Sequence, residues 1–228
     1  MLNFSASKLR LQRLYSEKKA GDVAPELLEC WSEPLTSGNA SWEDVKFLVV
    51  DTETSALTVD QGEMLSIGWV EISAGSINLN SARHYLLEAE GEVGQSATIH
   101  QLRDCELVEG LAADVVLKKF LAVAKGKVLV FHHAPLDIAF LNGLSLEHLG
   151  APLLWLVADT LEIEKQKLQR KSEDLGGGKL RLAHCRSRYH LPDYPAHNAL
   201  VDAIATAELL LAQIRYKGED CQLDDLLC

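Results

Sequence analysis

An acidic pattern directly after a buried strand constrains this chain of 228 residues more than any other feature. Residues 47–50 are apolar and rich in strand-forming side chains, and Asp51 and Glu53 come at once after them. Because alternate side chains of a strand point the same way, these two carboxylates share one face and lie about 7 Å apart along the strand. Carboxylates this close repel each other unless a cation lies between them, and Mg²⁺ and Mn²⁺ prefer oxygen ligands of this kind. The pattern alone also fits a solvated strand-to-loop junction. A metal site is therefore indicated only if the rest of the chain supplies further ligands.

The composition is that of a globular protein with one domain and an extension. The apolar share is 47% and the charged share is 24%, with no apolar run as long as the roughly 18 residues of a membrane span. No apolar signal core follows the basic residues near the N-terminus, so we expect a cytoplasmic location and no membrane partner. Five scattered cysteines without C-x-x-C spacing indicate reduced thiols rather than disulfides or a zinc site.

The net charge of −11 argues against a protein that coats nucleic acid by bulk attraction. It does not exclude an enzyme that meets phosphates through metal ions, because a metal cluster needs local acids. The negative net charge therefore does not exclude an enzyme of this class.

The chain divides into three predicted parts. Residues 1–45 contain two short helical patterns, the second opened by Pro25, and then a loop rich in small polar residues. We interpret this part as an N-terminal helical extension that packs on the domain or docks a partner. Residues 46–218 form the main domain, and residues 219–228 form an acidic C-terminal tail.

Within the main domain, periodicity predicts strands and helices in a mixed order. Strands are expected at 46–50, 64–72, 83–88, 127–131 and 155–158, the first three as an antiparallel meander. Helices are expected at 112–124, 135–142, 180–189 and 203–215. The polar stretch 165–179 contains three glycines without a P-loop frame, so it is predicted to be a flexible loop. The arginines of the 180–189 helix either face solvent or help to hold a polyanion.

A third acid follows a second buried strand. Asp137 is expected in the first turn of the helix that Pro135 opens, directly after the strand at 127–131. Open α/β sheets place their ligands at such junctions, so Asp137 is a candidate metal ligand. The alternative is a carboxylate that only interacts with the helix dipole.

The last motif is a histidine and an aspartate at the start of the final long helix. Asn198 is a suitable N-cap, which places Asp202 in the first turn and His197 just outside the helix. Inside a helix, residues five apart point about 140° apart. Because His197 lies in the entry loop instead, both side chains can reach one centre.

The ordered set of Asp51, Glu53, Asp137, His197 and Asp202 resembles the DEDDh 3′→5′ exonucleases, over roughly residues 46–215. That family includes the proofreading subunit of the bacterial replicative polymerase, with RNase T-like and oligoribonuclease-like enzymes. The resemblance implies an α/β, ribonuclease H-like fold, a mixed five-stranded sheet with helices on both faces. Two departures from the family pattern are Ala56, where a glycine usually follows the second acid, and Pro135, which is close enough to Asp137 to shift the reach of the third acid; neither removes a catalytic group.

The resemblance also implies a mechanism with two divalent metal ions, Mg²⁺ or Mn²⁺, on the attacking and leaving oxygens. Asp51 would bridge both ions, and Glu53 and Asp202 would hold the ion that carries the attacking water. Asp137 would position the second ion. His197 would be the general base, because an imidazole of near-neutral pKa can accept the proton of the water.

The expected substrate is the 3′ end of a single-stranded nucleic acid, hydrolysed to nucleoside 5′-monophosphates. DNA in proofreading or repair is the first choice, with RNA 3′-end trimming or oligoribonucleotide degradation as alternatives. Thr54, Leu57 and His100 are predicted substrate contacts, although a purely structural role fits His100 as well.

Three other functions fit parts of this sequence less well. An aspartate-nucleophile phosphatase would need Asp at position 53 and would leave His197 without a role. A silent binding module of the same fold tends to lose an acid, and none is lost here. A subunit tethered to a polymerase or sliding clamp would use residues 222–227, although Asp225 stands where a clamp peptide has Leu. The alternative for those residues is a frayed acidic tail.

Overall fold

The computed structural model describes residues 6–19, 21, 23–88, 110–172, 175–195 and 197–227. Its centre is a five-stranded sheet in the order β3-β2-β1-β4-β5. The strands are β1 (Phe47–Thr54), β2 (Met64–Ser73), β3 (Ser76–Leu86), β4 (Val128–Phe131) and β5 (Val157–Asp159). The first three strands pair antiparallel, and β4 and β5 continue parallel to β1. The predicted mixed ribonuclease H-like sheet is therefore confirmed.

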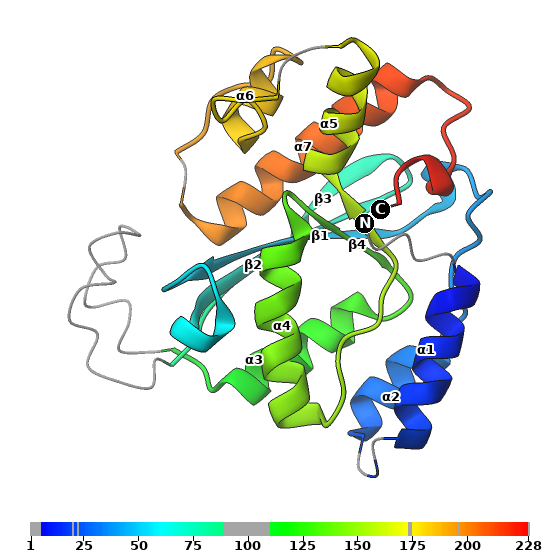
Figure 1. Ribbon diagram of the computed structural model, residues 1–228, viewed down its shortest axis with the longest axis vertical. Helices are drawn as coiled ribbons and strands as arrows, with labels where there is room; N and C mark the ends of the chain where they lie inside the picture. Colours follow the sequence, from blue (N-terminus) through cyan, green and yellow to red (C-terminus); the bar gives the residue numbers. More distant parts are fainter. Residues whose placement is uncertain are drawn as a thin grey trace.

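Helices cover both faces of this sheet (Figure 1). The helices are α1 (Ala6–Lys19), α2 (Pro25–Ser32), α3 (Ala113–Ala124), α4 (Ala134–Leu149), α5 (Thr160–Arg170), α6 (Leu182–Ser187) and α7 (Ala199–Lys217). Helices α3 and α4 lie on one side of the sheet, and α5 and α7 lie on the other (Figure 1). Among the described residues, no helix combines the length and the apolar character needed to cross a lipid bilayer.

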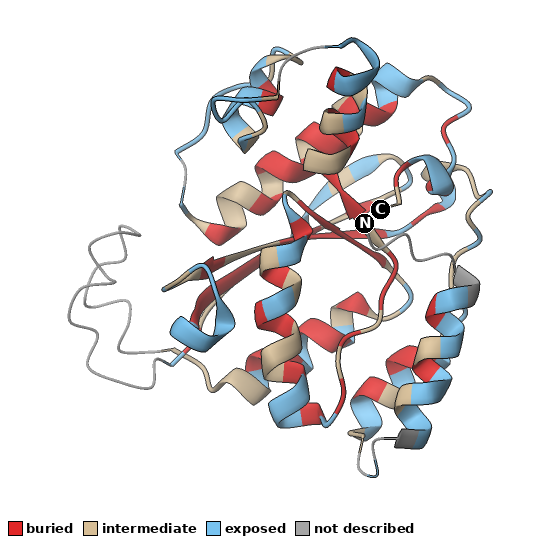
Figure 2. Ribbon diagram, in the orientation of Figure 1, coloured by how far each residue is buried: buried red, intermediate tan, exposed pale blue. Residues whose placement is uncertain are grey.

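The sequence of the central strand β1 explains why helices must cover both faces of the sheet. Phe47 and Val49 belong to one buried apolar cluster, while Leu48 and Val50 belong to the other. Successive side chains of a strand point to opposite faces, so an uninterrupted apolar run is buried only between two layers of helices. Figure 2 shows this strand and the inner faces of the helices as buried, with the exposed residues outside.

In the polar part of the chain, one prediction is wrong and the bounds of another differ from the structure. The stretch from residue 165 is not all flexible loop, because helix α5 runs from Thr160 to Arg170. Its N-cap Asp159 accepts a hydrogen bond from the backbone of Leu161. The predicted helix at 180–189 is shorter and spans Leu182–Ser187. Helix α5 buries few apolar residues, so its sequence lacks the apolar stripe by which a helix is normally predicted.

The N-terminal helices pack on the domain. Leu9 of α1 and Leu27 of α2 are both buried, in different apolar clusters. The buried guanidinium of Arg13 donates hydrogen bonds to the backbone oxygens of Leu154 and Trp31. Burial lowers the pKa of Arg13 to about 10. The boundary at residue 45 stays a prediction, and the extension shares both cores of the main domain.

The C-terminal segment is not frayed over residues 221–227. It contains the short 3-10 helix η5 (Leu223–Asp225), and Leu223 and Leu226 are fully buried. Isolated bridges pair Gln222 with Ser41 and Leu227 with Ala158. The alternative of a frayed acidic tail is therefore wrong for these residues, whose leucines complete the cluster beneath α5 and α7.

The described cysteines agree with the expectation of reduced thiols. Cys30, Cys185 and Cys221 are free and buried. Burial raises the pKa of the Cys30 and Cys185 thiols to about 11, which keeps them protonated and unreactive at neutral pH.

Candidate active site

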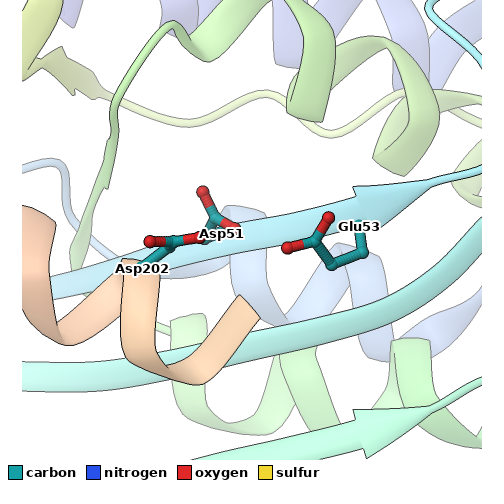
Figure 3. A group of neighbouring side chains, drawn as sticks. All are labelled: Asp51, Glu53 and Asp202. Carbon is teal, nitrogen blue, oxygen red and sulfur yellow. The ribbon is translucent and has the colours of Figure 1, made fainter. Parts of the chain in front are cut away.

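Three carboxylates from two distant parts of the chain converge at one point. Asp51 and Glu53 come from β1, and Asp202 comes from the first turn of α7. One oxygen of each lies within 4.8 Å of the others. Figure 3 shows the Asp202 side chain extending from the helix toward Asp51, with Glu53 further along the strand. The sequence prediction that these three acids meet agrees with the structure.

A glycine in the neighbouring strand allows this approach. Gly68 of β2 is the register partner of Asp51. A Cβ atom at position 68 would overlap the backbone of Ala199 and Leu200 at the start of α7. The helix can therefore lie directly on the sheet beside Asp51 only because this residue is glycine. No motif of the sequence pointed to Gly68, and the one available signal was a glycine inside an apolar strand, which often marks close backbone approach.

The start of α7 follows the predicted capping. The Asn198 side chain accepts a hydrogen bond from the backbone of Val201, at 3.1 Å, as an N-cap does. The backbone N–H of His197 donates to Oδ2 of Asp202 at 2.9 Å. His197 is exposed and has a left-handed φ of 71°. The entry loop is thus tied to the carboxylate that it flanks, with His197 outside the helix as predicted.

Asp137 lies behind this group rather than within it. It is buried in the first turn of α4 and is not one of the three converging acids. Its Oδ1 accepts hydrogen bonds from the backbone N–H of Thr52 at 3.0 Å and from the Thr52 hydroxyl at 2.7 Å. Pro135 fits within the same first turn. These bonds fix the Asp137 carboxyl next to β1, and its charge acts on Asp51 and Glu53.

Burial raises the pKa of all four acids, and repulsion from neighbouring acids raises the pKa of Asp51 and Glu53 further. Burial, followed by repulsion from Asp137, Asp202 and Glu53, raises the pKa of Asp51 well above its usual value. Burial and the neighbouring aspartates raise the pKa of Glu53 to about 7. Burial raises the pKa of Asp137 to about 7 and also raises that of Asp202. Because the donors are all carboxylates that resist ionisation together, the group fits a divalent cation with hard oxygen ligands.

Asp159 supports the turn that carries Asp137. It is buried at the end of β5, and its carboxylate accepts hydrogen bonds from the backbone N–H groups of His133 and Ala134, both at 2.9 Å. These groups belong to the turn between β4 and α4, in which His133 has a left-handed φ of 76°. The sequence showed Asp159 after a strand but gave it no role.

Arg186 ties the loop before His197 to α7. It is buried and not solvent-facing, and it donates to the backbone oxygens of Ala205 and Pro192. Its second Nη2 partner is the Glu208 carboxylate at 2.7 Å. The prediction that this arginine faces solvent or holds a polyanion is wrong, because its donors are taken up inside the protein.

The predicted substrate contacts remain predictions. The Thr54 hydroxyl donates to the backbone oxygen of Ala56 at 2.8 Å, which shapes the bend after β1. Leu57 is 82% exposed in that bend, so its side chain is available to a ligand. Ala56 faces Gly62, where a side chain would collide with it. His100 lies outside the described residues.

The sequence of this chain matches an exonuclease family model and is similar to DNA polymerase III proteins. The RNase T family model, described as an exonuclease, matches residues 48–210. The DNA polymerase III PolC-type protein of Thermotoga petrophila is 28% identical over 176 residues, covering 77% of this chain and 12% of that protein. DNA polymerase III subunit epsilon of Treponema pallidum is 27% identical over 178 residues, covering 78% of this chain and 80% of that protein.

The solved structures agree on the fold. The zinc-bound Escherichia coli exonuclease I–ssDNA complex has a TM-score of 0.63 and 13% identity, covering 76% of this chain and 41% of that one. This chain spans only about an eighth of the PolC-type relatives, so those matches concern one segment of much longer proteins. The family match covers well over half of the chain and confirms the resemblance seen in the acidic motifs. The chain belongs to the exonuclease family that includes the DNA polymerase III epsilon and PolC-type exonuclease segments.

Proposed function

We propose that this exonuclease is metal-dependent and removes nucleotides from the 3′ end of single-stranded nucleic acid, with DNA preferred over RNA. The observation that carries the proposal is the convergence of Asp51, Glu53 and Asp202 within 4.8 Å, beside an exposed histidine. Buried carboxylates this close repel one another when they are ionised, and a bound cation relieves that repulsion. The same arrangement suits hydrolysis of a phosphodiester, which needs charge neutralised on two oxygens.

Each residue has a distinct task in this mechanism. Asp51, Glu53 and Asp202 would hold two divalent ions, Mg²⁺ or Mn²⁺, which supply charge neutralisation at the attacking and leaving oxygens. His197 accepts the proton of the attacking water, and its exposed loop lets the imidazole approach the chain end. Asp137, fixed by Thr52, adds negative charge behind the cluster and would help to position the second ion. The products are a nucleoside 5′-monophosphate and a strand shorter by one residue.

The choice of DNA rests on the relatives. Those described above are DNA polymerase III components, and the structural neighbour was solved with single-stranded DNA. Trimming of RNA 3′ ends or degradation of oligoribonucleotides is the alternative, and recognition of the 2′-hydroxyl would decide between them. The relatives also support a polymerase as partner. A sliding clamp is not supported as partner, because the leucines of residues 222–227 that would bind it include the buried Leu223 and Leu226.

The test uses single-stranded DNA and RNA of equal sequence, labelled at the 3′ or the 5′ end, with Mn²⁺, Mg²⁺ or EDTA. We expect a metal-dependent ladder that shortens from the 3′ end, faster on DNA. Asp51→Ala and Asp202→Ala should abolish it with little loss of stability, because removing one crowded acid relieves repulsion. His197→Ala should lower turnover by roughly 10²–10⁴ while metal binding is retained. Asp44→Ala, which removes an exposed acid outside the cluster, is the control.

Retention of near-full activity by Asp51→Ala or Asp202→Ala would refute the assignment of the metal ligands. A ladder that shortens from the 5′ end would refute the direction. If RNA were degraded faster than DNA, RNA would be the preferred substrate in place of DNA.

A further inference from the structure

A polar pocket lies away from the acidic cluster, between α5, the C-terminal end of α7 and the segment around residues 220–225. Its volume is about 430 Å³, within the range of small-molecule sites. Gln213 lines it and follows Asp202 by eleven residues on α7, so the two lie roughly 16 Å apart along the helix axis. The pocket is therefore separate from the candidate active site.

The lining of this pocket carries an excess of positive charge in a strongly acidic chain. Four cationic side chains line it: Lys167, Arg170, Lys171 and Lys217. Two acidic residues, Asp220 and Asp225, also line the pocket. In the part of the chain that the structure describes, the side chains of Arg170, Lys171 and Lys217 form no ion pair. Cations gathered at one pocket without carboxylate partners favour an anionic ligand.

Two tyrosines place aromatic faces among these cations. The rings of Tyr189 and Tyr216 meet edge to face, with centroids 6.1 Å apart. The Lys167 ammonium lies 4.0 Å from the first centroid and 4.4 Å from the second, and Lys171 lies 5.6 Å from the second. Tyr216 is 56% exposed, so part of its ring is open to stacking.

The buried network beneath the pocket holds these groups in place. Glu164 is fully buried and accepts a hydrogen bond of 2.7 Å from the Tyr189 hydroxyl. It also pairs with Lys167 at 3.4 Å and with Arg188 at 3.7 Å. The position of Tyr189 and Lys167 is thus fixed from below, which favours a preformed site.

Gln213 offers the pocket an unused acceptor. Its side chain is 1% exposed, and its Nε2 donates to the backbone oxygen of Thr160 at 2.8 Å. Its Oε1 is buried and has no hydrogen-bond partner. A buried acceptor of this kind is stabilised when a ligand brings an N–H or O–H donor.

We propose that this pocket binds a nucleoside phosphate. The phosphate would meet the unpaired cations, the base would stack on Tyr216, and an N–H or O–H group would donate to Gln213 Oε1. A free nucleotide and one nucleotide of a longer strand share this chemistry, and the two are separated by experiment. Binding here does not depend on the nuclease activity proposed above.

The test is isothermal titration calorimetry on the full chain in EDTA, so that no metal-dependent hydrolysis or metal-dependent binding contributes. The probes are dAMP, AMP, adenosine, inorganic phosphate and the tetranucleotide d(A)₄. Arg170→Ala with Lys171→Ala removes two exposed cations of the pocket, and Arg10→Ala with Lys18→Ala on α1 is the matched control. Tyr216→Leu is matched with Tyr15→Leu, since Tyr15 is 64% exposed on α1.

We expect a nucleotide to bind more tightly than phosphate or adenosine. The double change in the pocket should weaken it by about tenfold for each cation lost, which is the size of a charge-assisted hydrogen bond. Tyr216→Leu should weaken it by roughly tenfold through lost stacking, and both control proteins should bind as the wild type does. Tighter binding of d(A)₄ than of dAMP, lost in the same variants, would identify a strand as the ligand, and equal binding would identify the free nucleotide.

Three results would overturn the proposal: no binding of any nucleotide, binding of inorganic phosphate as tight as that of dAMP, or equal loss in the pocket and control variants. These results are independent of the nuclease assay. An inactive protein that still binds dAMP in EDTA would refute the proposed exonuclease and leave the pocket assignment standing.

Discussion

Replacing Glu53 by Gln should make the metal-free protein more stable at alkaline pH, although it removes a proposed metal ligand. Burial and two neighbouring aspartates raise the pKa of Glu53 from 4.5 to about 7 in the folded protein. Its charged form is therefore disfavoured by folding when no metal is present. Gln has nearly the same shape and never carries this charge.

The sign of the pH dependence follows from the raised pKa. The folded protein holds a proton on Glu53 more tightly than the unfolded chain does, so this contribution to stability is fully present below pH 4.5. It is lost as the pH rises through about 7. At about 1.4 kcal/mol for each tenfold change in proton affinity, the loss amounts to about 3 kcal/mol. Glu53 is only 8% exposed, so solvent screens little of it.

The measurement is urea unfolding in EDTA between pH 4 and pH 8, for the wild type and Glu53→Gln. At pH 4 the two free energies of unfolding should agree, and at pH 8 the variant should be more stable by about 3 kcal/mol. Adding Mn²⁺ at pH 8 should stabilise the wild type, by about 2.7 kcal/mol at a hundred times its dissociation constant, and should stabilise the variant less. A variant that is less stable than the wild type at pH 8 in EDTA would refute the account of repulsion within the cluster.

Three further changes test the supports of the site and of the fold. Gly68→Ala should push the start of α7 and Asp202 away from the sheet, abolishing most nuclease activity and costing about 1–3 kcal/mol of stability in urea unfolding. Arg13→Ala should lower the free energy of unfolding by about 2–4 kcal/mol, because it leaves two backbone carbonyls without donors. Arg186→Met should free the loop before His197, lowering kcat by roughly 10–100-fold in steady-state assays with a smaller change in KM.

Each of these changes has a control of the same kind. An added methyl at Gly21 meets nothing within 4 Å, so Gly21→Ala should be neutral. Arg10→Ala on the exposed face of α1 and Arg215→Met near the end of α7 remove exposed arginines. Full activity of the Gly68→Ala protein would contradict the role of close packing in placing α7. A neutral Arg13→Ala would show that the hydrogen bonds of this guanidinium add nothing to the stability of the fold.

The sequence predicted the site where local patterns carry the information. A run of apolar residues ending in Asp51 and Glu53 predicts both a buried strand and two acids on one face. Asn198 predicts a helix start, and hence the positions of His197 and Asp202 relative to it. These features depend on a few neighbouring residues, so a single sequence is enough to find them.

Other features depend on contacts between distant segments, and the sequence does not reveal them. Helix α5 is mostly polar, because α7 and the C-terminal segment cover only one narrow side of it. The role of Gly68 becomes visible only when α7, about 130 residues later, is placed on the sheet. Arg186 looked like a surface charge because nothing in its own helix shows the carbonyls that surround it.

The terminal segments have a physical reason to pack as they do. The acidic cluster lowers the stability of the metal-free fold, by about 3 kcal/mol for Glu53 alone at pH 8. A fully buried leucine contributes about 1.5–3 kcal/mol, and Leu9, Leu27 and Leu223 are buried at 1% exposure or less. Because these side chains come from outside residues 46–218 and fill both apolar clusters, the extensions offset a large part of that repulsion. The stability of the acidic site therefore depends on segments that contribute no ligand to it.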